Sequence, residues 1–314
     1  MSTIAIAGIN GFAGHHVANA AVNSGHNVIG ISREQDISPM LRDIVMSYVS
    51  CDLADASAVG SLNILGYDSI INLAGFAKVG VSENERADYL RVNAAVHTNL
   101  ANVLVFNGHN TRMISVSSGA VYSPAQAMPL TEQSKIVAPN AAGVYAASKL
   151  HMEEELQNYI IKGANIIIAR PFNHSGPGQQ PGFLIPDLAL RIQSAQPESE
   201  ILCGNLTTKR DYTHVDDVAR AYVLLATAAK LSSRLYNICS GTSTKGTRVF
   251  ELLTHNLNKS GVLCRVDPDL QRLNDPSELY GSFELLHDDK GWKPSKKIDQ
   301  IIRDYATWLK DSAL

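Results

Sequence analysis

Short apolar segments alternate with longer segments of helical periodicity along the first half of the chain. Each apolar segment is nearly continuous and rich in Val, Ile and Ala, which is typical of strands buried on both faces of a parallel sheet. Between them, apolar residues recur every three to four positions, which indicates helices packed on that sheet. The expected strands are Ile4–Ala7, Asn27–Ser32, Ser47–Asp52, Ser69–Ala74, Arg112–Ser117 and Ala164–Arg170. The expected helices cover about residues 14–24, Asp88–Asn107 and the segment that begins near Tyr145.

The pattern changes after about residue 172. Residues 173–182 (NHSGPGQQPG) are rich in Gly, Pro and polar side chains, which predicts a loop rather than an element. The later elements are expected to be helices near 185–195, 215–229 and 296–310, with strands near 200–204 and 234–238. The sequence therefore predicts an α/β fold. A Rossmann-type doubly wound parallel sheet would occupy residues 1–172, with a contribution from about 215–240, and a smaller C-terminal α/β domain would occupy most of 173–314.

Composition and charge narrow the classes of partner. The 314 residues carry a formal net charge of −3, which favours neither nucleic acid nor an anionic membrane as partner. No apolar run reaches the roughly 18 residues of a membrane-spanning helix, and the N-terminus lacks the pattern of a secretory signal. Because Cys51, Cys203, Cys239 and Cys264 are scattered in apolar contexts, we expect reduced buried thiols and a cytoplasmic protein. No spacing of His, Cys or Asp predicts a metal site.

A glycine-rich loop, GINGFAG from Gly8 to Gly14, lies between the first strand and the first helix. Glycines at such a place permit a tight turn, close approach of the backbone to a pyrophosphate, and close packing of the helix on the strand. The spacing is GxxGxxG instead of the common GxGxxG. The evidence for dinucleotide binding is therefore the position of the loop, directly after the first strand of the chain. We expect a dinucleotide to contact Gly8, Gly11, Phe12, Ala13 and Gly14.

The end of the second strand bears on the choice of cofactor. An acidic residue there would hold the ribose of NAD, but this chain has Ser32 followed by Arg33. A neutral residue and a cation suit a 2′-phosphate, which favours NADP(H), with NAD(H) as the alternative. Glu34 and Asp36 follow closely and would weaken the attraction for a phosphate.

Three residues with the chemistry of hydride-transfer enzymes occur in order along the chain. Ser118 follows the fifth expected strand, and Tyr145 and Lys149 lie four positions apart on one face of the next helix. Because strand ends of a doubly wound sheet converge on one crevice, Ser118 and Tyr145 can face the same ligand. An ammonium one turn from Tyr145 would favour its phenolate and let it act as an acid or base, while Ser118 would polarise a carbonyl.

With these motifs in place, the chain resembles an extended short-chain dehydrogenase/reductase of the nucleotide-sugar epimerase/dehydratase group, nearly from end to end. Asp52-Leu53 resembles the adenine-contacting pair of that family, Asn72-Leu73-Ala74-Gly75 its loop beside the cofactor, and Asn93 its active-site asparagine. The segment Pro171-Phe172-Asn173-His174 resembles the part that meets nicotinamide and then substrate. The resemblance implies a cofactor site that includes these residues, with Lys149 also holding the nicotinamide ribose.

The same resemblance implies a nucleotide-sugar substrate. The block from Arg210 to Asp217 (RDYTHVDD) and the C-terminal stretch that includes Arg272 resemble the family's substrate-binding signatures. Arg210 and Arg272 would clamp the substrate diphosphate, and Ser118 and Asn173 would also contact the substrate. The phrases RPFNHSGPGQ and GFLIPDLALRI are most similar to GDP-mannose dehydratases and GDP-4-keto-6-deoxymannose reductases.

The residues after Ser118 narrow the reaction. Dehydratases of this group have an acidic pair at the positions of Gly119 and Ala120, and neither of these residues can transfer a proton. The leading hypothesis is therefore an NADPH-dependent reductase of a nucleotide-linked 4-keto-6-deoxyhexose, with Tyr145 as proton donor. The alternative is an NAD-dependent nucleotide-sugar 4-epimerase. A non-catalytic NADP-binding regulator is a third interpretation, which the presence of both Tyr145 and Lys149 disfavours.

Family members often dimerise through a four-helix bundle, so the resemblance also implies a homodimer. The apolar residues Leu150, Met152, Leu156 and Tyr159 on the Tyr145 helix fit such an interface, and packing against the sheet is the alternative explanation for them.

Overall fold

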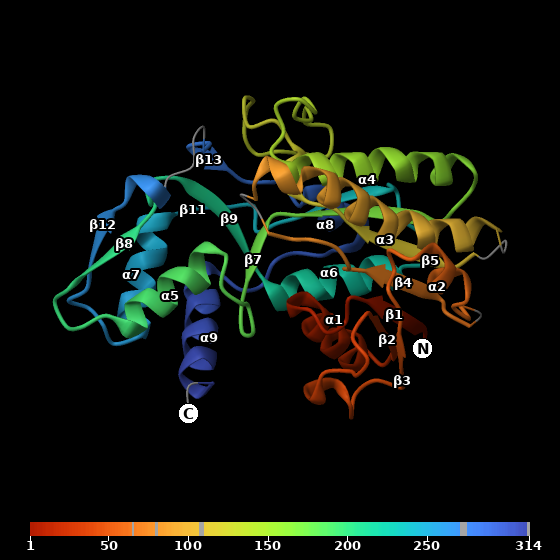
Figure 1. Ribbon diagram of the computed structural model, residues 1–314, viewed down its shortest axis with the longest axis horizontal. Coiled ribbons are helices and arrows are strands. Elements are labelled where there is room, and N and C mark those ends of the chain that lie inside the picture. Colours follow the sequence, from red (N-terminus) through yellow and green to blue (C-terminus); the bar gives the residue numbers. More distant parts are fainter. Residues whose placement is uncertain (65, 79–80, 107–109, 271–274, 313–314) are drawn as a thin grey trace.

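The structure, a computed structural model, describes residues 1–314 except 65, 79–80, 107–109, 271–274 and 313–314. Its larger part is a seven-stranded sheet in the order β10-β6-β5-β4-β1-β2-β3, and all six pairings in it are parallel (Figure 1). This is the doubly wound Rossmann-type arrangement predicted from the sequence. The strands are β1 (Thr3–Ala7), β2 (Asn27–Ser32), β3 (Ser47–Ser50), β4 (Ser69–Asn72), β5 (Arg112–Val116), β6 (Ile166–Pro171) and β10 (Leu235–Ile238).

Helices cover both faces of this sheet. On one face, Ile4 and Ile6 of β1 pack in a core cluster with residues of α1 (Phe12–Asn23) and α6 (Val215–Thr227), while α8 (Glu284–Lys290) borders the same cluster. On the other face, Ala5 and Ala7 pack with residues of α3 (Arg86–Phe106) and α4 (Val144–Ile161), and a short α2 (Ala56–Gly60) lies beside them. The near-continuous apolar strands are thus explained by burial on both sides.

The C-terminal part of the chain forms its own core, to the left in Figure 1. It is built around helices α5 (Leu184–Ser194), α7 (Gly246–Asn256) and α9 (Ile298–Asp311), with the two-stranded parallel pair β8 (Glu200–Cys203) and β12 (Leu263–Val266). A small mixed sheet connects this part to the larger one. Its strands are β7 (Asn173–Ser175), β9 (Lys209–His214), β11 (Ser243–Lys245) and β13 (Glu278–Leu279).

The elements expected from the sequence are present, with ends that differ by a few residues. The segment 173–182 is a correction, because its first residues form strand β7 and pair in parallel with β9. The elements that were not predicted are α2, β9, β11, α7, β12, β13 and α8. The short strands among them are stabilised by pairing with segments that are remote in the sequence, so local periodicity carries little information about them.

Two of the cysteines correct the expectation of reduced thiols. Because β12 lies beside β8, Cys203 and Cys264 have their Cα atoms 6.3 Å apart and are joined in a disulfide across 61 residues of sequence. Cys51 and Cys239 are free and buried, as expected. The cytoplasmic location rested partly on reduced thiols and stays a prediction.

Three of the four apolar residues that we assigned to a dimer interface are buried in the monomer, whereas Tyr159 is only partly buried. Met152 and Leu156 are completely buried against the sheet, and Leu150 is 7% exposed in a neighbouring cluster. The alternative explanation, packing against the sheet, is therefore correct for Met152 and Leu156, and the homodimer stays a prediction. In the part of the chain that the structure describes, no helix combines the length and apolarity needed to cross a membrane, and no cluster of three potential metal ligands occurs.

Candidate active site

The loop after β1 forms a cradle for an anion. Gly8 has a positive φ of 77°, and a Cβ at Gly8 would lie 3.1 Å from the amide nitrogen of Ala74. A Cβ on Gly14 would lie 2.3 Å from the carbonyl oxygen of Ile9, so this position accommodates no side chain. Gly11, the N-cap of α1, has no capping side chain, and the first helical turn contains no acidic residue. The free approach to the backbone and the positive helix end fit a pyrophosphate.

The end of β2 presents Arg33 beside this loop. The Arg33 side chain is 75% exposed, and its Nε lies 3.6 Å from the carboxylate of Glu34. Ser32 is buried, and its hydroxyl lies 2.9 Å from the hydroxyl of Tyr48, which donates to the backbone oxygen of Glu34. An exposed guanidinium at this strand end is suited to a 2′-phosphate, with Glu34 as the competing anion.

The glycine loop is also tied to the segment after β2 through Asn10. The Asn10 side chain donates to the backbone oxygen of Asp36 at 3.0 Å and accepts from the backbone N–H of Ser38 at 2.9 Å. Asn10 and Tyr48 were not predicted, because Asn10 occupies a variable position between the glycines and Tyr48 is remote from Arg33 in the sequence. An amide within a glycine loop is the available indication for Asn10.

The residues predicted after β3 and β4 lie at the same edge of the sheet. Asp52 is exposed, and its side chain accepts a hydrogen bond from the backbone two residues on. Leu53 is buried, while Leu73 and Ala74 are partly buried. Gly75 has a φ of 133°, which favours glycine. Parallel strands place these carboxyl-terminal loops beside the glycine cradle, where an open α/β sheet binds its ligand.

Asn93 connects the loop after β4 to the helix that carries Tyr145. Its side chain is fully buried, accepts from the backbone N–H of Phe76 at 2.7 Å and donates to the hydroxyl of Ser148 at 2.8 Å. Ser148 in turn donates to the backbone oxygen of Tyr145 at 2.8 Å. A Cβ at Gly75 would come within 2.7 Å of the Asn93 Oδ1 atom, so the close approach depends on this glycine. Asn93 therefore fixes the position of the α4 N-terminus.

Ser118 and Tyr145 lie within hydrogen-bonding reach of each other, and Lys149 follows Tyr145 by one turn on α4. Ser118 is the N-cap of a 3-10 turn at Gly119–Val121, and Tyr145 lies in the first turn of α4. A hydrogen bond with the Ser118 side chain opposes the effect of burial, which raises the pKa of Tyr145. Lys149 is buried, and its Nζ donates to the backbone oxygen of Val116 at 2.9 Å. This arrangement can deliver a proton from Tyr145 to a substrate oxygen held by Ser118.

The electrostatic effect on Tyr145 differs from the expectation. Burial dominates and raises the pKa of Tyr145 above its usual value, and Lys149 does not lower it in this structure. The Lys149 ammonium instead donates to the backbone oxygen of Val116 at the end of β5. Burial lowers the pKa of Lys149 to about 8, against an opposing effect of Glu153. Tyr145 is accordingly protonated at neutral pH, the form required of a proton donor.

In the segment after β6, Phe172 packs in the core and His174 lies beside the glycine loop. Phe172 is buried against Gly119 and Gly281, so a cofactor contact by Phe172 would have to come from its backbone. The His174 ring is stacked over that of Phe12 at 6.1 Å between centroids, with an interplanar angle of 5°. This stacking brings two predicted cofactor residues together, one from the glycine loop and one from β7.

The predicted substrate residues are less completely assembled. Pro171 ends β6, and Asn173 begins β7 as an exposed residue. Arg210 on β9 is only 15% exposed and donates to the carboxylate of Asp275 at 2.6 Å, so its guanidinium already has an anionic partner. Arg272 lies outside the described residues.

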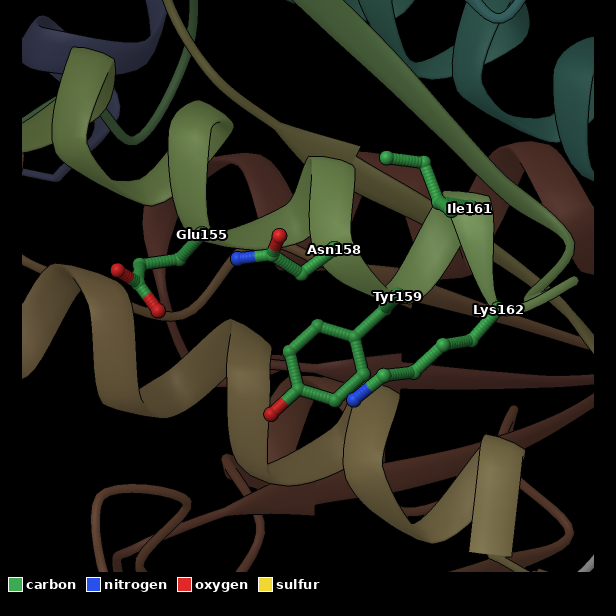
Figure 2. Close-up of a pocket in the computed structure, with 5 residues that line it drawn as sticks. All are labelled: Glu155, Asn158, Tyr159, Ile161 and Lys162. Atoms are coloured by element: carbon green, nitrogen blue, oxygen red, sulfur yellow. The ribbon is translucent and has the colours of Figure 1, made fainter.

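Two surface cavities lie away from this constellation. One of about 320 Å³ is lined by residues of α4 and the residue that follows it, from Glu155 to Lys162, as Figure 2 shows. Sixteen residues of helix separate Ile161 from Tyr145, or about 24 Å at 1.5 Å per residue. The other, of about 420 Å³, adjoins Arg112 and Ile167 near the amino ends of β5 and β6. Ligands of parallel sheets bind at the opposite, carboxyl ends, so neither cavity is the candidate site.

The fold and the Ser118–Tyr145–Lys149 constellation define a dinucleotide-dependent oxidoreductase. A model of the NAD-dependent epimerase/dehydratase family matches residues 4–239. GDP-6-deoxy-D-mannose reductase from Pseudomonas aeruginosa is 32% identical over 258 residues, covering 80% of this chain and 83% of the relative. UDP-glucose 4-epimerase from Pisum sativum is 27% identical, with 98% and 96% covered. The structure of RMD from Pseudomonas aeruginosa with NADPH has a TM-score of 0.83 and 28% identity, covering 99% and 100%.

The chain belongs to the NAD-dependent epimerase/dehydratase family. It is therefore an enzyme, an NAD(P)-dependent oxidoreductase that acts on nucleotide sugars, as expected from the resemblance.

Proposed function

We propose that the chain is an NADPH-dependent reductase of a nucleotide-linked 4-keto-6-deoxyhexose, with GDP as the nucleotide. The observation that supports this most is the convergence of Ser118 and Tyr145, combined with Gly119 and Ala120 where an elimination would need acids. A proton donor without an eliminating acid suits the addition of hydride and proton to a ketone.

Bound NADPH would supply the hydride to the sugar C4 atom. The Ser118 hydroxyl would orient the ketone oxygen by a hydrogen bond, and Tyr145 would donate the proton to that oxygen. Lys149 would hold the nicotinamide ribose, and Asn93 would keep the N-terminus of α4 in position through Ser148. The backbone of the glycine loop would bind the pyrophosphate.

The packing around Gly119 supports the exclusion of a dehydratase. A Cβ at Gly119 would lie 2.9 Å from two ring atoms of Phe172, and Phe172 is itself buried. An acidic side chain cannot enter this position unless Phe172 moves. Proton abstraction from the sugar by a residue at 119 is therefore incompatible with the packing.

The choice of NADPH is based on Arg33. Its exposed guanidinium follows β2 where an acidic residue would bind the ribose of NAD, and the relative RMD was solved with NADPH. Arg33→Ala should weaken NADPH binding much more than NADH binding, whereas equal effects on both would contradict the assignment. Arg91→Ala is a matched control, since Arg91 is similarly exposed and lies on α3.

An NAD-dependent 4-epimerase is the second candidate. The similarity to the UDP-glucose 4-epimerase of Pisum sativum extends over 98% of the chain, and the Tyr145 pair serves either reaction. A reductase consumes one reduced cofactor per turnover, whereas an epimerase returns the hydride and consumes none.

The test follows cofactor absorbance after mixing the enzyme with GDP-4-keto-6-deoxymannose and either NADPH or NADH. Stoichiometric oxidation of NADPH supports the reductase. Interconversion of 4-epimeric nucleotide sugars without net cofactor oxidation would replace it by the epimerase. The same assay with UDP, dTDP and CDP sugars tests the assignment of GDP.

The C-terminal part from about residue 173 is proposed as the substrate-binding domain, with Arg210 and Arg272 at the diphosphate. In the described structure Arg210 is bound to Asp275, so substrate binding would exchange one anionic partner for another. Arg210→Lys should raise KM more than it lowers kcat, because a lysine cannot form the bidentate contact.

We also propose a homodimer, with the α3 and α4 face as the interface. Two large apolar side chains, Phe106 at the end of α3 and Ile161 at the end of α4, are 88% and 81% exposed. Analytical ultracentrifugation should give twice the chain mass of 33.9 kDa, and Phe106→Glu with Ile161→Glu should shift it to the monomer. A wild-type monomer at working concentrations would contradict this.

A further inference from the structure

The elements that carry Ser118, Tyr145 and Lys149 meet at a buried carboxylate. Glu153 lies one turn beyond Lys149 on α4, and its carboxylate accepts a hydrogen bond from the Ser117 hydroxyl at the end of β5. On its other side, Arg170 of β6 donates to it through Nε at 2.9 Å and through a terminal nitrogen at 2.5 Å. One side chain thereby joins α4, β5 and β6.

The Glu153–Arg170 ion pair is buried in the protein interior. The side chains of Glu153 and Arg170 are 9% and 7% exposed, and the Arg170 guanidinium lies 4.8 Å from the ring centre of Tyr122. Removing charged groups from water is costly, so one member without the other would be strongly unfavourable. Retention of a charge here points to a role beyond packing.

We propose that Glu153, paired with Arg170, is a positioning residue that fixes the turn that carries Ser118 and places a negative charge one helical turn beyond Lys149. This inference rests on the proposed function, since it assigns Lys149 and Ser118 their roles in hydride transfer.

The charges around Lys149 support this assignment. On its own helix, Tyr145 and Glu153 lie one turn before and one turn after Lys149. His97 of α3 interacts electrostatically with Lys149, and Arg170 of β6 is bound to Glu153. His97 is completely buried, and both burial and Lys149 lower its pKa, so it is neutral and adds no charge. Glu153 is the negative group that opposes the loss of the Lys149 proton on burial.

The second contact places Ser118. Ser117 donates its backbone N–H to the oxygen of Ala169 and its hydroxyl to Glu153, so both of its donors are bound. Because Ser118 follows directly, its hydroxyl is held at the entrance of the 3-10 turn. A substitution at Glu153 would therefore change the pKa of Lys149 electrostatically and the position of Ser118 through the lost hydrogen bond with Ser117.

The test measures the titration of Lys149 itself. The full-length protein is labelled at the lysine ε-carbon, the Lys149 signal is assigned by its absence in Lys149→Met, and its pKa is followed by NMR. Glu153→Gln should lower that pKa by about one to two units, because an opposite charge is lost from its surroundings. Glu154→Gln is the matched control, with the same charge change at an exposed neighbouring position, and should leave it unchanged.

Arg170→Gln should shift the same pKa upward, since it removes a cation and leaves the anion. Opposite shifts from the two partners would not arise from a merely structural role. The double variant with Glu153→Gln and Arg170→Gln removes both buried charges. It replaces the single variant Glu153→Gln in this test if that variant does not fold. In that double variant the pKa should still lie below the wild-type value, because Glu153 is the charge that raises the pKa of Lys149 and it is lost.

The pH profile of ketone reduction is the functional readout. If Lys149 must be charged, the alkaline limit of kcat/KM should move to lower pH in Glu153→Gln by the same amount as the pKa. A Lys149 pKa at or above the wild-type value in either folded Glu153 variant would overturn the inference. Absence of ketone reduction by the wild-type enzyme would instead overturn the proposed function, and the NMR titration would still decide the role of Glu153.

Discussion

Alanine at Gly14 would place a methyl group 2.3 Å from the carbonyl oxygen of Ile9 and 2.6 Å from that of Gly8. Both atoms belong to the backbone, so no side-chain rotation relieves the contact and either the loop or α1 must move. Forcing an extra carbon into a packed site costs about 1–3 kcal/mol. We therefore expect Gly14→Ala to lose about 2 kcal/mol of unfolding free energy and to bind NADPH at least about tenfold more weakly, as the displaced amides no longer fit the pyrophosphate.

Gly11 in the same loop gives a matched contrast. Its φ of −76° and ψ of 168° are open to any residue, and a Cβ there would approach only the carbonyl oxygen of Gly8, at 3.2 Å. Gly11→Ala should therefore fold with a stability within about 0.5 kcal/mol of the wild type. Its methyl group would nevertheless stand where the pyrophosphate approaches the loop, so NADPH affinity should still fall.

Urea denaturation and fluorescence titration with NADPH measure the two quantities separately. We expect loss of both stability and NADPH affinity in Gly14→Ala, and loss of NADPH affinity alone in Gly11→Ala. Wild-type stability in Gly14→Ala would refute the packing argument. Unchanged NADPH binding by Gly11→Ala would refute the placement of the pyrophosphate at this loop.

Three further predictions concern the catalytic acid, a buried carboxylate and the disulfide. Tyr145→Phe should lower kcat by about 10²–10⁴ without changing NADPH affinity, and retention of a tenth of the rate would exclude Tyr145 as proton donor. Burial raises the pKa of Asp211 to about 6, so the folded state binds the proton more tightly than the unfolded state, and this group favours folding less as pH rises. Wild-type stability should therefore fall by about 1 kcal/mol more than that of Asp211→Asn between pH 5 and 7 in denaturation curves; parallel curves would contradict this. Reduction should cost the wild type up to about 4 kcal/mol by the loop-entropy relation, and Cys264→Ser should be insensitive to reductant.

The parallel sheet could be predicted because each of its strands has a recognisable sequence pattern. A strand buried on both faces is apolar throughout, and the β1 residues Ile4–Ala7 are all completely buried. The short strands of the smaller sheet lack such a pattern. β9 (Lys209–His214) begins with exposed and ends with buried residues, and its neighbours come from sequence positions as distant as Asn173 and Glu278. Its formation depends on tertiary pairing that no local pattern encodes.

The spacing of Tyr145 and Lys149 predicted that they share a helix face, and it could not predict where the ammonium points. Lys149 has four rotatable side-chain bonds, and the acceptor it reaches is the Val116 oxygen on another element. The pKa of Tyr145 consequently follows its burial and not the nearby lysine. The order of residues in the sequence is sufficient to predict which of them form the site. Their pKa values depend on where each charged group lies within a few ångströms, which the sequence does not give.

The sequence contained evidence for the Glu153–Arg170 ion pair. Arg170 ends the apolar run ANIIIAR, where a charge on a buried strand requires a partner. Glu153 stands four residues after Lys149, at the spacing of a helical ion pair. The sequence left open which of three consecutive acids, from Glu153 to Glu155, faces the sheet, and the structure assigns the buried position to Glu153.

The arrangement at Gly119 bears on how reaction type is encoded in this site. Phe172 occupies the space beside Gly119, and a Cβ at Gly281 would lie 2.5 Å from the same ring. The absence of an acid at 119 is therefore linked to two other positions, one on the segment after β6 and one just after β13. A single Gly119→Glu change would meet the Phe172 ring before it reached a sugar, so it should impair folding without creating dehydratase activity. Conversion would require Phe172 to become smaller at the same time, which means that the packing between the two parts of the chain limits the chemistry as much as the catalytic residues do.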